Sequence, residues 1–532
     1  MTNVELFVQK IFGVDLTEKQ LHFQNTSDRT LWYKVKHATR TMYVPGMNVL
    51  RINPMELDRF IGFVDSLLHF GIDSPMYRWD NLNLYEYHGE EEVEAGLRLL
   101  MGNYSHALMG VDIETRDVSW DNNKLLAIGF AVDDDTCLAF YDIPQHLYPL
   151  LEKALNMPGA TYAWHNGKFD CEHLWYTCSI KAHVDEDTML KHYVQISEKK
   201  GSHGLKELGP IYLQAPQWDD ELDAYKKKWC RERKIKIADF KYDMIPTNIL
   251  IPYMQRDCIA TRRLLTVFEQ LKEEGTDWIY RQLIRASNTF RCIECNGATV
   301  DQEHLAMLDK ELSADLQAAT DDVNESIAYF WNPVAYSQET GAKYKEEFSL
   351  KSPKQLKWLL SKATGMQLES TDAATIDKLV EIAEEGVVKF DPHTIKLLEG
   401  IKRSRKASKY LDTYVTGIRN VLCSDGKVRA NYNLHGTETG RLSSSNPNAQ
   451  NIPRDKKIKN IFKAPKGYKL VQLDYSQAEL RVLGVLSNDP FLIKSYIEDK
   501  DLHANVAEEI FGPDFTKEQR TQCKTINFGK LA

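Results

Sequence analysis

The segment Val471–Arg481 constrains the fold of this chain more than any other stretch. It begins as an apolar run that ends in Asp474 and continues as SQAELRVLGVL, in which apolar residues recur at helical spacing. This pattern predicts a buried strand that delivers Asp474 to the start of a helix. Carboxylate oxygens are hard ligands, and Mg²⁺ sites typically combine one or two of them with substrate phosphates. A core strand followed by an Asp that only caps the helix is the alternative.

Four further acids lie in three separated segments of the amino-terminal half. Asp112 and Glu114 end an apolar run, and their i, i+2 spacing places both on one face of a strand. Asp170 closes the sequence HNGKFD, and Asp257 follows Tyr253 by one helical turn. Two cations about 4 Å apart activate water and stabilise the leaving oxygen of a phosphodiester, and only clustered carboxylates hold such a pair. The set therefore predicts a two-metal phosphodiesterase site, whereas a solvated strand end would explain the first two acids alone.

The composition indicates an ordinary globular protein of about three domains at a length of 532 residues. A formal net charge of −9 does not indicate nucleic-acid binding, but a basic cleft can lie on an acidic body. The first twenty residues lack the pattern of a signal peptide, and no apolar run is long enough to span a bilayer. Nine scattered cysteines fit a reducing compartment. We therefore expect a cytoplasmic protein with no membrane partner.

Several charged segments have a structural explanation beside a functional one. The acidic run 90–94 is expected to open a solvated helix, since Glu is favoured in a first turn. The acids at 185–187 are expected to start another helix. The basic run 226–236 predicts a solvated helix face, with phosphate contact as the competing interpretation. Four unevenly spaced histidines, His165, His173, His183 and His203, are not expected to be metal ligands.

The segment Asp474–Arg481 resembles motif A of the DNA polymerase I family (family A) of bacteria and phages. The motif reads DYSQ-x-ELR, and this chain matches every fixed position. Three more segments resemble family motifs in the same order: TGRLSSSNPNAQNIP at 439–453, DLH at 501–503, and Arg520-x3-Lys524-x3-Phe528-Gly529. Four motifs in order are far more specific than any one of them.

The earlier acids resemble the three motifs of the proofreading 3′–5′ exonuclease domain of the same family, DIE, NGKFD and YxxxD. The resemblance implies that Asp112, Glu114, Asp170 and Asp257 are metal ligands and that Tyr253 orients the attacking water. It also implies a ribonuclease-H-like α/β fold. Because no position departs from these motifs, we expect an active exonuclease.

The resemblance also implies how the carboxyl-terminal half binds DNA. Arg441, Asn448 and Gln450 would line the primer–template duplex, where their donors suit the minor-groove acceptors that every base pair presents. A basic cluster in the preceding helical region would contact duplex phosphates without choosing sequence. Its members are Lys402, Arg403, Arg405, Lys406 and Lys409.

For the incoming nucleotide, the resemblance implies that Asp474 is the palm metal ligand and that Glu479 crowds the sugar 2′ position. Residues four apart on a helix differ by only about 40° around its axis at each step, so the two cations Arg520 and Lys524 and the ring of Phe528 lie along one side of the helix. The resemblance places these residues and His503 at the triphosphate and the base.

We therefore expect an α/β multidomain protein: a ribonuclease-H-like exonuclease domain followed by a partial right-hand polymerase with a mostly helical thumb, a partial palm and the start of the fingers. The expected boundaries are 1–100 for a region of unknown role, 101–275 for the exonuclease, and 276–532 for the polymerase. Within the polymerase we expect the thumb at about 340–430, the palm at about 431–485 and the fingers from about 486.

The sequence departs from the family after the fourth motif. Ala532 stands where the family has a Tyr, and no His-Asp-Glu hairpin with the second palm carboxylate follows Asp474. Three explanations are open: a split polymerase completed by a second polypeptide, which we favour, a fragment of a longer product, or an exonuclease with a vestigial polymerase half.

The expected function is DNA-directed DNA polymerase with 3′–5′ proofreading in DNA replication, in a bacterial or phage-infected cell. Two Mg²⁺ or Mn²⁺ ions per active site are expected, with primer–template DNA, single-stranded DNA and dNTPs as partners. The alternatives are a stand-alone 3′–5′ DNA exonuclease and a noncatalytic DNA-binding clamp.

Overall fold

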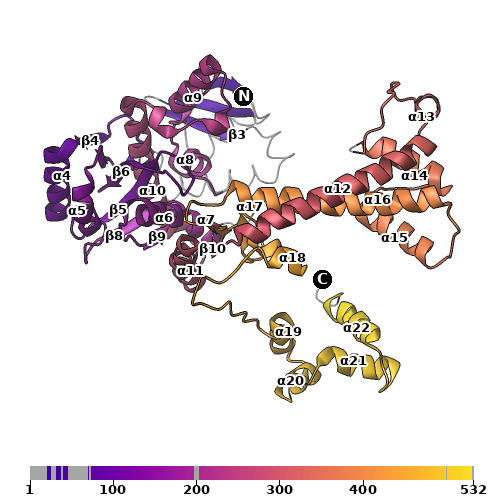
Figure 1. Cartoon of the computed structure of the whole chain (residues 1–532). Helices are drawn as coiled ribbons and strands as arrows, with labels where there is room; N and C mark the ends of the chain where they lie inside the picture. The colour runs from indigo at the N-terminus through magenta and orange to yellow at the C-terminus, as the bar shows by residue number, and fades with distance from the viewer. Residues whose placement is uncertain are drawn as a thin grey trace. The chain divides into compact units, whose positions relative to one another are not determined.

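The computed structural model describes residues 74–196, 203–350, 352–498 and 500–529, together with Phe70 and the backbone of three amino-terminal strands. Side chains of 525–529 lie outside the description. The three strands are β1 (Leu21–Asn25), β2 (Leu31–His37) and β3 (Arg40–Pro45), which form an antiparallel sheet. The chain divides into two compact units, 1–463 and 464–532 (Figure 1). None of the helices within the described ranges combines the length and apolar character that crossing a bilayer requires.

A six-stranded mixed sheet forms the centre of what we call the sheet domain, residues 83–296. Its strand order is β4-β7-β6-β5-β8-β9. The central strand β5 runs antiparallel to β6 and parallel to β8. The strands are β4 (Asn83–His88), β5 (Leu108–Thr115), β6 (Leu125–Ala131), β7 (Thr136–Tyr141), β8 (Thr161–Trp164) and β9 (Glu186–Asp187).

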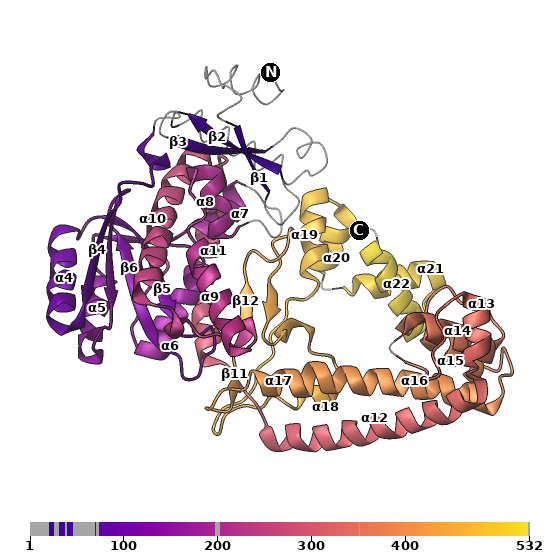
Figure 2. The same cartoon turned by 90° about the horizontal axis from the view of Figure 1, so that it is seen from above.

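Helices cover both faces of this sheet, which gives a three-layer arrangement (Figure 2). One face buries apolar side chains against α4, α5, α6, α7 and α11. The other face packs against α10, whose Ile251, Met254 and Cys258 contact small residues of β6 and β7. The helices are α4 (Gly89–Asn103), α5 (Tyr148–Ala154), α6 (Gly167–Cys178), α7 (Thr188–Gln195), α8 (Leu205–Leu213), α9 (Asp220–Arg233), α10 (Thr247–Leu271) and α11 (Asp277–Asn296). The α/β fold expected for this region is confirmed.

Two glycines allow α10 to lie directly on the sheet. A Cβ at Gly110 of β5 would stand 2.2 Å from the backbone oxygen of Cys258, and one at Gly129 of β6 would stand 2.6 Å from the Cys258 Sγ. Real Cβ atoms do not approach other atoms so closely, so only glycine is compatible with this spacing. The helix therefore comes as near to β5 as backbone atoms permit.

The rest of the first unit is mostly helical, as expected. The long helices α12 (Gln302–Phe330) and α16 (Pro392–Tyr410) pack along each other. With α14 (Pro353–Thr364) and α15 (Ala373–Glu384) they bury a leucine-rich core that includes Leu356, Leu359 and Leu397. Figure 2 shows α13 (Pro333–Thr340) beside α14 and α15.

Short strands connect the sheet domain to this helical region. β10 (Ala298–Thr299) pairs with β11 (Lys427–Val428), and β12 (Asn431–Asn433) pairs with β13 (Ser443–Ser445). We call the latter pair the β12–β13 hairpin. The helix α17 (Gly417–Asn420) precedes β11, and the helix α18 (Lys456–Lys459) follows the β12–β13 hairpin.

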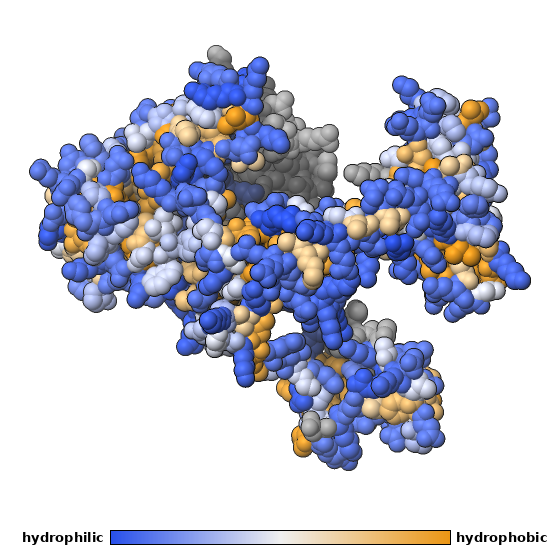
Figure 3. All heavy atoms as spheres, in the orientation of Figure 1, coloured by the Kyte–Doolittle hydropathy of each residue, from blue (hydrophilic) through white to orange (hydrophobic). Residues whose placement is uncertain are grey.

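The second unit contains four helices in its described residues, α19 (Ala478–Ser487), α20 (Pro490–Ile497), α21 (Leu502–Phe511) and α22 (Lys517–Gly529). The predicted buried strand before Asp474 is wrong for this structure. The segment has no strand partner among the described residues, and Val471 and Leu473 are 77% and 90% exposed. A strand is stable only when its backbone groups find partners, so local apolar character was not sufficient here. Figure 3 shows further apolar surface on this unit.

The packing of α10 on β5 can be tested at a single glycine. Gly110→Ala should lower the melting temperature of the sheet domain by about 4 °C or more, because overpacking costs about 1–3 kcal/mol and a backbone oxygen cannot rotate away. Differential scanning calorimetry measures this. Gly102→Ala in α4 is the control: nothing lies within 4 Å of its Cβ, so the helix should be unchanged or more stable. Equal melting temperatures for both variants would contradict the packing argument.

Candidate active site

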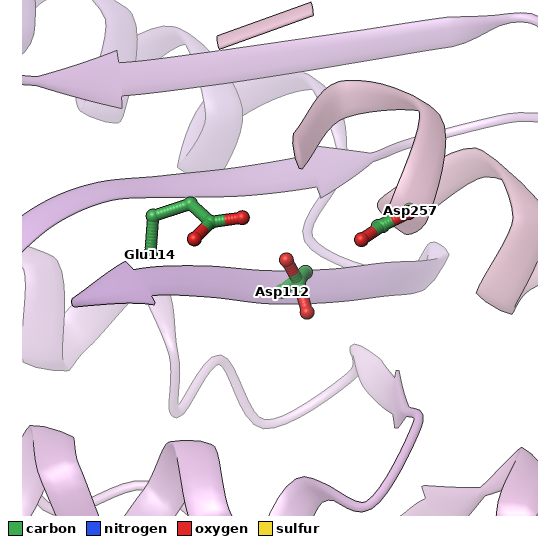
Figure 4. Close-up of side chains that lie close together, drawn as sticks. All are labelled: Asp112, Glu114 and Asp257. Atoms are coloured by element: carbon green, nitrogen blue, oxygen red, sulfur yellow. The ribbon is translucent and has the colours of Figure 1, made fainter. Parts of the chain in front are cut away.

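Three carboxylates converge where α10 crosses the central strand of the sheet. Asp112 and Glu114 belong to β5, and Asp257 belongs to α10. One oxygen of each lies within 4.8 Å of the others, and Figure 4 shows the three side chains turned toward a common space. The close approach of α10 at Gly110 makes this possible, because it brings a helix-borne acid to the surface of the strand.

Asp170 lies beside this group but is not part of the triad. It belongs to α6, is 4% exposed, and its Oδ1 accepts a hydrogen bond from the backbone N–H of Ile113 at 3.2 Å. Ile113 lies between Asp112 and Glu114, so this hydrogen bond joins Asp170 to the strand that carries both acids. Its charge contributes to raising the pKa of Asp112.

Burial raises the pKa of every acid in the group, and neighbouring carboxylates add to the rise at Asp112, Glu114 and Asp170. For Asp112 and Glu114 burial is the largest cause, followed by neighbouring carboxylates, and both pKa values rise well above their usual range. Burial raises the pKa of Asp170 to about 8 and also raises the pKa of Asp257, which Lys206 opposes. Buried carboxylates without enough cationic neighbours are costly unless they bind metal, and this donor set of hard oxygens suits Mg²⁺ or Mn²⁺.

Tyr253 lies on α10 one turn before Asp257, as the sequence spacing predicted. Burial, Asp257 and Glu114 raise the pKa of this phenol well above its ordinary value. The side chain therefore remains neutral and keeps its O–H as a hydrogen-bond donor beside the carboxylates.

Sequence reasoning missed two residues that touch the acids. Lys206 of α8 forms an ion pair with Asp257, and its Nζ lies 4.0 Å from the ring centre of Tyr253 and 4.4 Å from that of Trp218. Trp218 Nε1 donates to Asp257 Oδ1 at 2.5 Å. The sequence around Lys206, GLKEL, has ordinary helical spacing, so no local pattern distinguished it.

The prediction of a helix start at 185–187 is confirmed, and Asp187 also makes hydrogen bonds to a second helix. Asp187 caps α7 by accepting from the N–H groups of Met189 and Leu190, and it also accepts from Asn166 and Gly167 at 3.2 and 2.9 Å. One carboxylate therefore binds the first turns of both α7 and α6. Burial raises the pKa of Asp187 to about 6. The acidic opening of α4 is likewise confirmed.

In the second unit, Asp474 and Glu479 are exposed. Asp474 precedes the helix that begins at Ala478, and Gln477 rather than Asp474 occupies the cap position. Among the described residues, the group of acids close enough to share a metal ion does not include Asp474. Its metal role stays a prediction.

The structure brings together three of the four residues predicted to bind the incoming nucleotide. Asp501 caps α21 through the N–H of His503 and receives two hydrogen bonds from Arg520, at 2.9 and 2.5 Å. Burial lowers the pKa of His503, and Arg520 and Lys524 lower it further, so these cations lie within electrostatic range of the ring. The side chain of Phe528 lies outside the described residues, although α22 includes its backbone.

Of the residues predicted to line the duplex, Arg441 lies in the connection between β12 and β13, and Asn448 and Gln450 follow β13. Arg441, Asn448 and Gln450 are exposed. The Oγ of Ser444 donates to Asn448 Oδ1 at 3.0 Å and accepts from the N–H of Gln450 at 3.2 Å. A single buried hydroxyl on β13 thus orders the loop that carries two of the three.

Several members of the basic cluster on α16 have polar or acidic partners in the structure. Lys402 pairs with Asp377, Arg403 pairs with Asp315, and Arg405 donates to a backbone oxygen. These partners lie far away in sequence, so they could not be read from the local run. Lys406 lies 4.0 Å from Asp455, and both Lys406 and Lys409 are exposed, as are Lys402 and Arg403.

The sheet and its carboxylates make the amino-terminal half an α/β domain with a cluster of acids that could hold a metal ion. A family model described as 3′-5′ exonuclease matches residues 91–274, and one described as DNA polymerase family A matches residues 322–531. The DNA polymerase of Escherichia phage T5 is 33% identical over 408 residues, covering 72% of this chain and 44% of the relative.

Two further relatives and one solved structure extend the comparison. The DNA polymerase of Bacillus phage SP01 is 30% identical (71% of this chain, 45% of the relative), and DNA polymerase I of Pseudomonas aeruginosa is 27% identical (80% and 46%). The POL domain of Pol1 from M. smegmatis, in complex with DNA primer-template and dNTP, matches with a TM-score of 0.60 at 22% identity, covering 84% of this chain and 70% of that one, which shows a shared fold.

The chain therefore belongs to DNA polymerase family A and carries the 3′–5′ exonuclease domain of that family. It spans about half the length of the curated relatives it matches.

The raised pKa values predict a pH-dependent response to metal. Asp170 keeps its proton until about pH 8 when folded but only to about 3.9 when unfolded, so its contribution to stability is fully present below about pH 3.9 and is lost as pH rises toward 8. A metal ion must displace that proton, so binding should strengthen over the same range. We expect Mn²⁺ to raise the melting temperature more at pH 8.5 than at pH 6.5, measured by calorimetry.

The control for this experiment removes the ligands without changing the side-chain shapes. The double variant Asp112→Asn/Glu114→Gln should show little Mn²⁺ response at either pH. A wild-type response that is equal at both pH values, or larger at pH 6.5, would contradict the assigned protonation.

Proposed function

We propose that the sheet domain hydrolyses the terminal phosphodiester at the 3′ end of single-stranded DNA and thereby proofreads for a family A polymerase. The observation that carries this proposal is the convergence of Asp112, Glu114 and Asp257 where α10 meets β5. The match of residues 91–274 to the 3′-5′ exonuclease family supports it.

The chain's own residues suit each part of this reaction. Asp112, Glu114, Asp170 and Asp257 would hold two Mg²⁺ or Mn²⁺ ions. Bound there, the ions would supply an activated water and stabilise the leaving oxygen. The neutral phenol of Tyr253 would orient the attacking water.

We propose that residues 322–531 contribute to DNA-directed DNA synthesis, with primer–template DNA and dNTPs as substrates and Asp474 as a palm metal ligand. The family A polymerase match supports this, as does the grouping of His503, Arg520 and Lys524, which suits a triphosphate. In this proposal Glu479 excludes ribonucleotides, Phe528 stacks on the base, and Arg441, Asn448 and Gln450 contact the duplex.

Polymerisation by this mechanism also needs a second palm carboxylate. The polymerase proposal therefore requires a palm completed by a further segment that bears this acid, whether that segment belongs to a second polypeptide or to a longer product. The polymerase proposal is favoured over a stand-alone exonuclease because a polymerase family model matches residues 322–531. Bacterial and phage relatives support a role in DNA replication in the cytoplasm of a bacterial or phage-infected cell.

The exonuclease proposal predicts the effect of removing two acids. Asp112→Ala with Glu114→Ala should lower the rate of shortening of a 3′-labelled single strand by about 1,000-fold or more, since bound metal supplies several kcal/mol of charge stabilisation. Gel assays with Mg²⁺ and with Mn²⁺ measure the rate. Glu90→Gln with Glu91→Gln removes two exposed charges from the same domain and should keep wild-type activity. A wild-type chain that is inert with both metals would count against the proposal.

The polymerase proposal predicts complementation. Mixing this chain with a polypeptide that bears the His-Asp-Glu hairpin should extend a primer on a template, and Asp474→Ala should abolish extension while 3′–5′ degradation continues. Extension that survives Asp474→Ala would reject the role assigned to this residue.

A further inference from the structure

A buried lysine joins the exonuclease domain to the region matched by the polymerase family. Lys168 lies on α6 two residues before Asp170, and its side chain is 7% exposed. Its Nζ donates to both carboxylate oxygens of Glu294 at 2.8 Å, to Glu172 Oε1 at 3.3 Å and to Asn431 Oδ1 at 2.9 Å. Three partner residues use the full donor capacity of an ammonium group, so the direction of the side chain is fixed.

The partners come from three different elements. Glu172 lies one turn further along α6, Glu294 lies near the end of α11, and Asn431 begins β12. Glu294 Oε1 also accepts from the N–H of Tyr432 at 2.8 Å, and the Tyr432 ring lies 5.1 Å from that of Phe290. The same lysine–glutamate pair therefore holds two successive residues of the β12–β13 hairpin.

Lys168 and Glu294 form a buried ion pair, since their side chains are 7% and 1% exposed. The Glu172 carboxylate, 5% exposed, lies 3.3 Å from the same Nζ. Displacing either charged partner would leave the other unpaired in a buried site, which strongly disfavours movement.

Helix geometry relates this group to the nuclease acid. Residues two positions apart on an α-helix are separated by about 200° around the axis. Lys168 and Asp170 therefore project from nearly opposite sides of α6. One side of the helix contacts Glu294 and Asn431, and the other presents Asp170 to the N–H of Ile113 on β5. The position of Asp170 therefore depends on where the hairpin and α11 hold α6.

A second set of contacts supports the same connection. The N–H and Oγ of Ser424 donate to Asp121, in the loop that follows β5, at 2.6 and 3.1 Å. Arg429 is 4% exposed, donates to Asp425 at 2.6 Å, and lies 4.5 Å from the ring centre of Tyr176 on α6. Residues 424–432 thus contact both elements that carry or flank the exonuclease acids.

We propose that Lys168 is a positioning residue of the exonuclease site, which acts through Glu294 and the β12–β13 hairpin to set the place of Asp170. This inference rests on the proposed exonuclease function. As a consequence, the hairpin expected to contact duplex DNA and the helix that carries Asp170 are joined through the buried contacts of Lys168 with Glu294 and Asn431. A displacement of the hairpin changes how well the nuclease holds its metal ions.

The test uses the whole chain and a single-stranded oligonucleotide. Residues that orient metal ligands typically change metal affinity or activity by about 10–100-fold, so Lys168→Met should raise the Mg²⁺ concentration for half-maximal exonuclease rate by about tenfold. Asn431→Ala lies outside the exonuclease family match, yet it should shift the Mg²⁺ dependence in the same direction by about threefold, as expected for one lost hydrogen bond.

Two controls separate positioning from loss of stability. Leu359→Ala removes a buried side chain of α14 from a core that contains none of residues 424–432, so it should lower the melting temperature without changing the Mg²⁺ dependence. Lys168→Met/Glu294→Leu removes both charges, so stability should recover relative to Lys168→Met while the Mg²⁺ shift persists, because the hairpin is no longer tied. Wild-type Mg²⁺ dependence in Lys168→Met would overturn the inference.

Calorimetric titration with Mn²⁺ distinguishes this inference from the proposed function. Lys168→Met should bind Mn²⁺ about tenfold more weakly than the wild-type chain, a result that requires no turnover. A wild-type chain that binds Mn²⁺ but does not degrade DNA would contradict the function alone. Equal Mn²⁺ affinities of the two chains would contradict the inference alone.

Discussion

The direct contact of α10 with β5 is the constraint on which the rest of the exonuclease domain depends. At Gly110 only a hydrogen atom separates the strand from the backbone oxygen of Cys258, the residue after Asp257. Because the helix lies so close, its carboxylate reaches those of Asp112 and Glu114. A larger residue at that position would move the helix and separate the acids, so the packing of the core and the geometry of the site are one property.

The fold keeps the carboxylates of the site close together although their negative charges repel one another. Four buried or half-buried acids lie close together, and burial, with repulsion between carboxylates at three of them, raises their pKa values. Hydrogen bonds from Ile113 and Trp218 and the ion pair with Lys206 stabilise the arrangement only in part. A rigid scaffold that keeps like charges together has a strong physical preference for divalent cations, which is the condition a two-metal nuclease requires.

The regions matched by the two family models, residues 91–274 and 322–531, contact each other at α6. α6 contacts the sheet with one side and the β12–β13 hairpin with the other, through buried polar groups. Buried ionic contacts have strict geometric requirements, whereas apolar contacts tolerate small shifts. A change in the position of the β12–β13 hairpin, which lies at the start of the polymerase motifs, would therefore be passed to the acids of the sheet domain. The second unit has a different character, because apolar side chains such as Leu473 and Leu486 face solvent there.

Much of the exonuclease site could be predicted from the sequence. Asp112, Glu114, Tyr253 and Asp257 stand at spacings that the strand and the helix impose, and local periodicity is what a sequence records directly. The strand before Asp474 could not be predicted in this way, since a strand depends on partners that a local pattern does not contain. The pairing of Arg403 with Asp315, and the loss of freedom this causes, was hidden for the same reason.

The sequence alone determined the set of acids, the α/β character of the exonuclease region and the order of the polymerase motifs, because chemistry and secondary structure both require particular residues at short, regular distances. Only the tertiary structure decided that Lys206 meets Asp257 and that Lys168 meets Glu294. These partners are 51 and 126 residues apart, and the contacts exist because packed helices bring them together, not because of any local spacing.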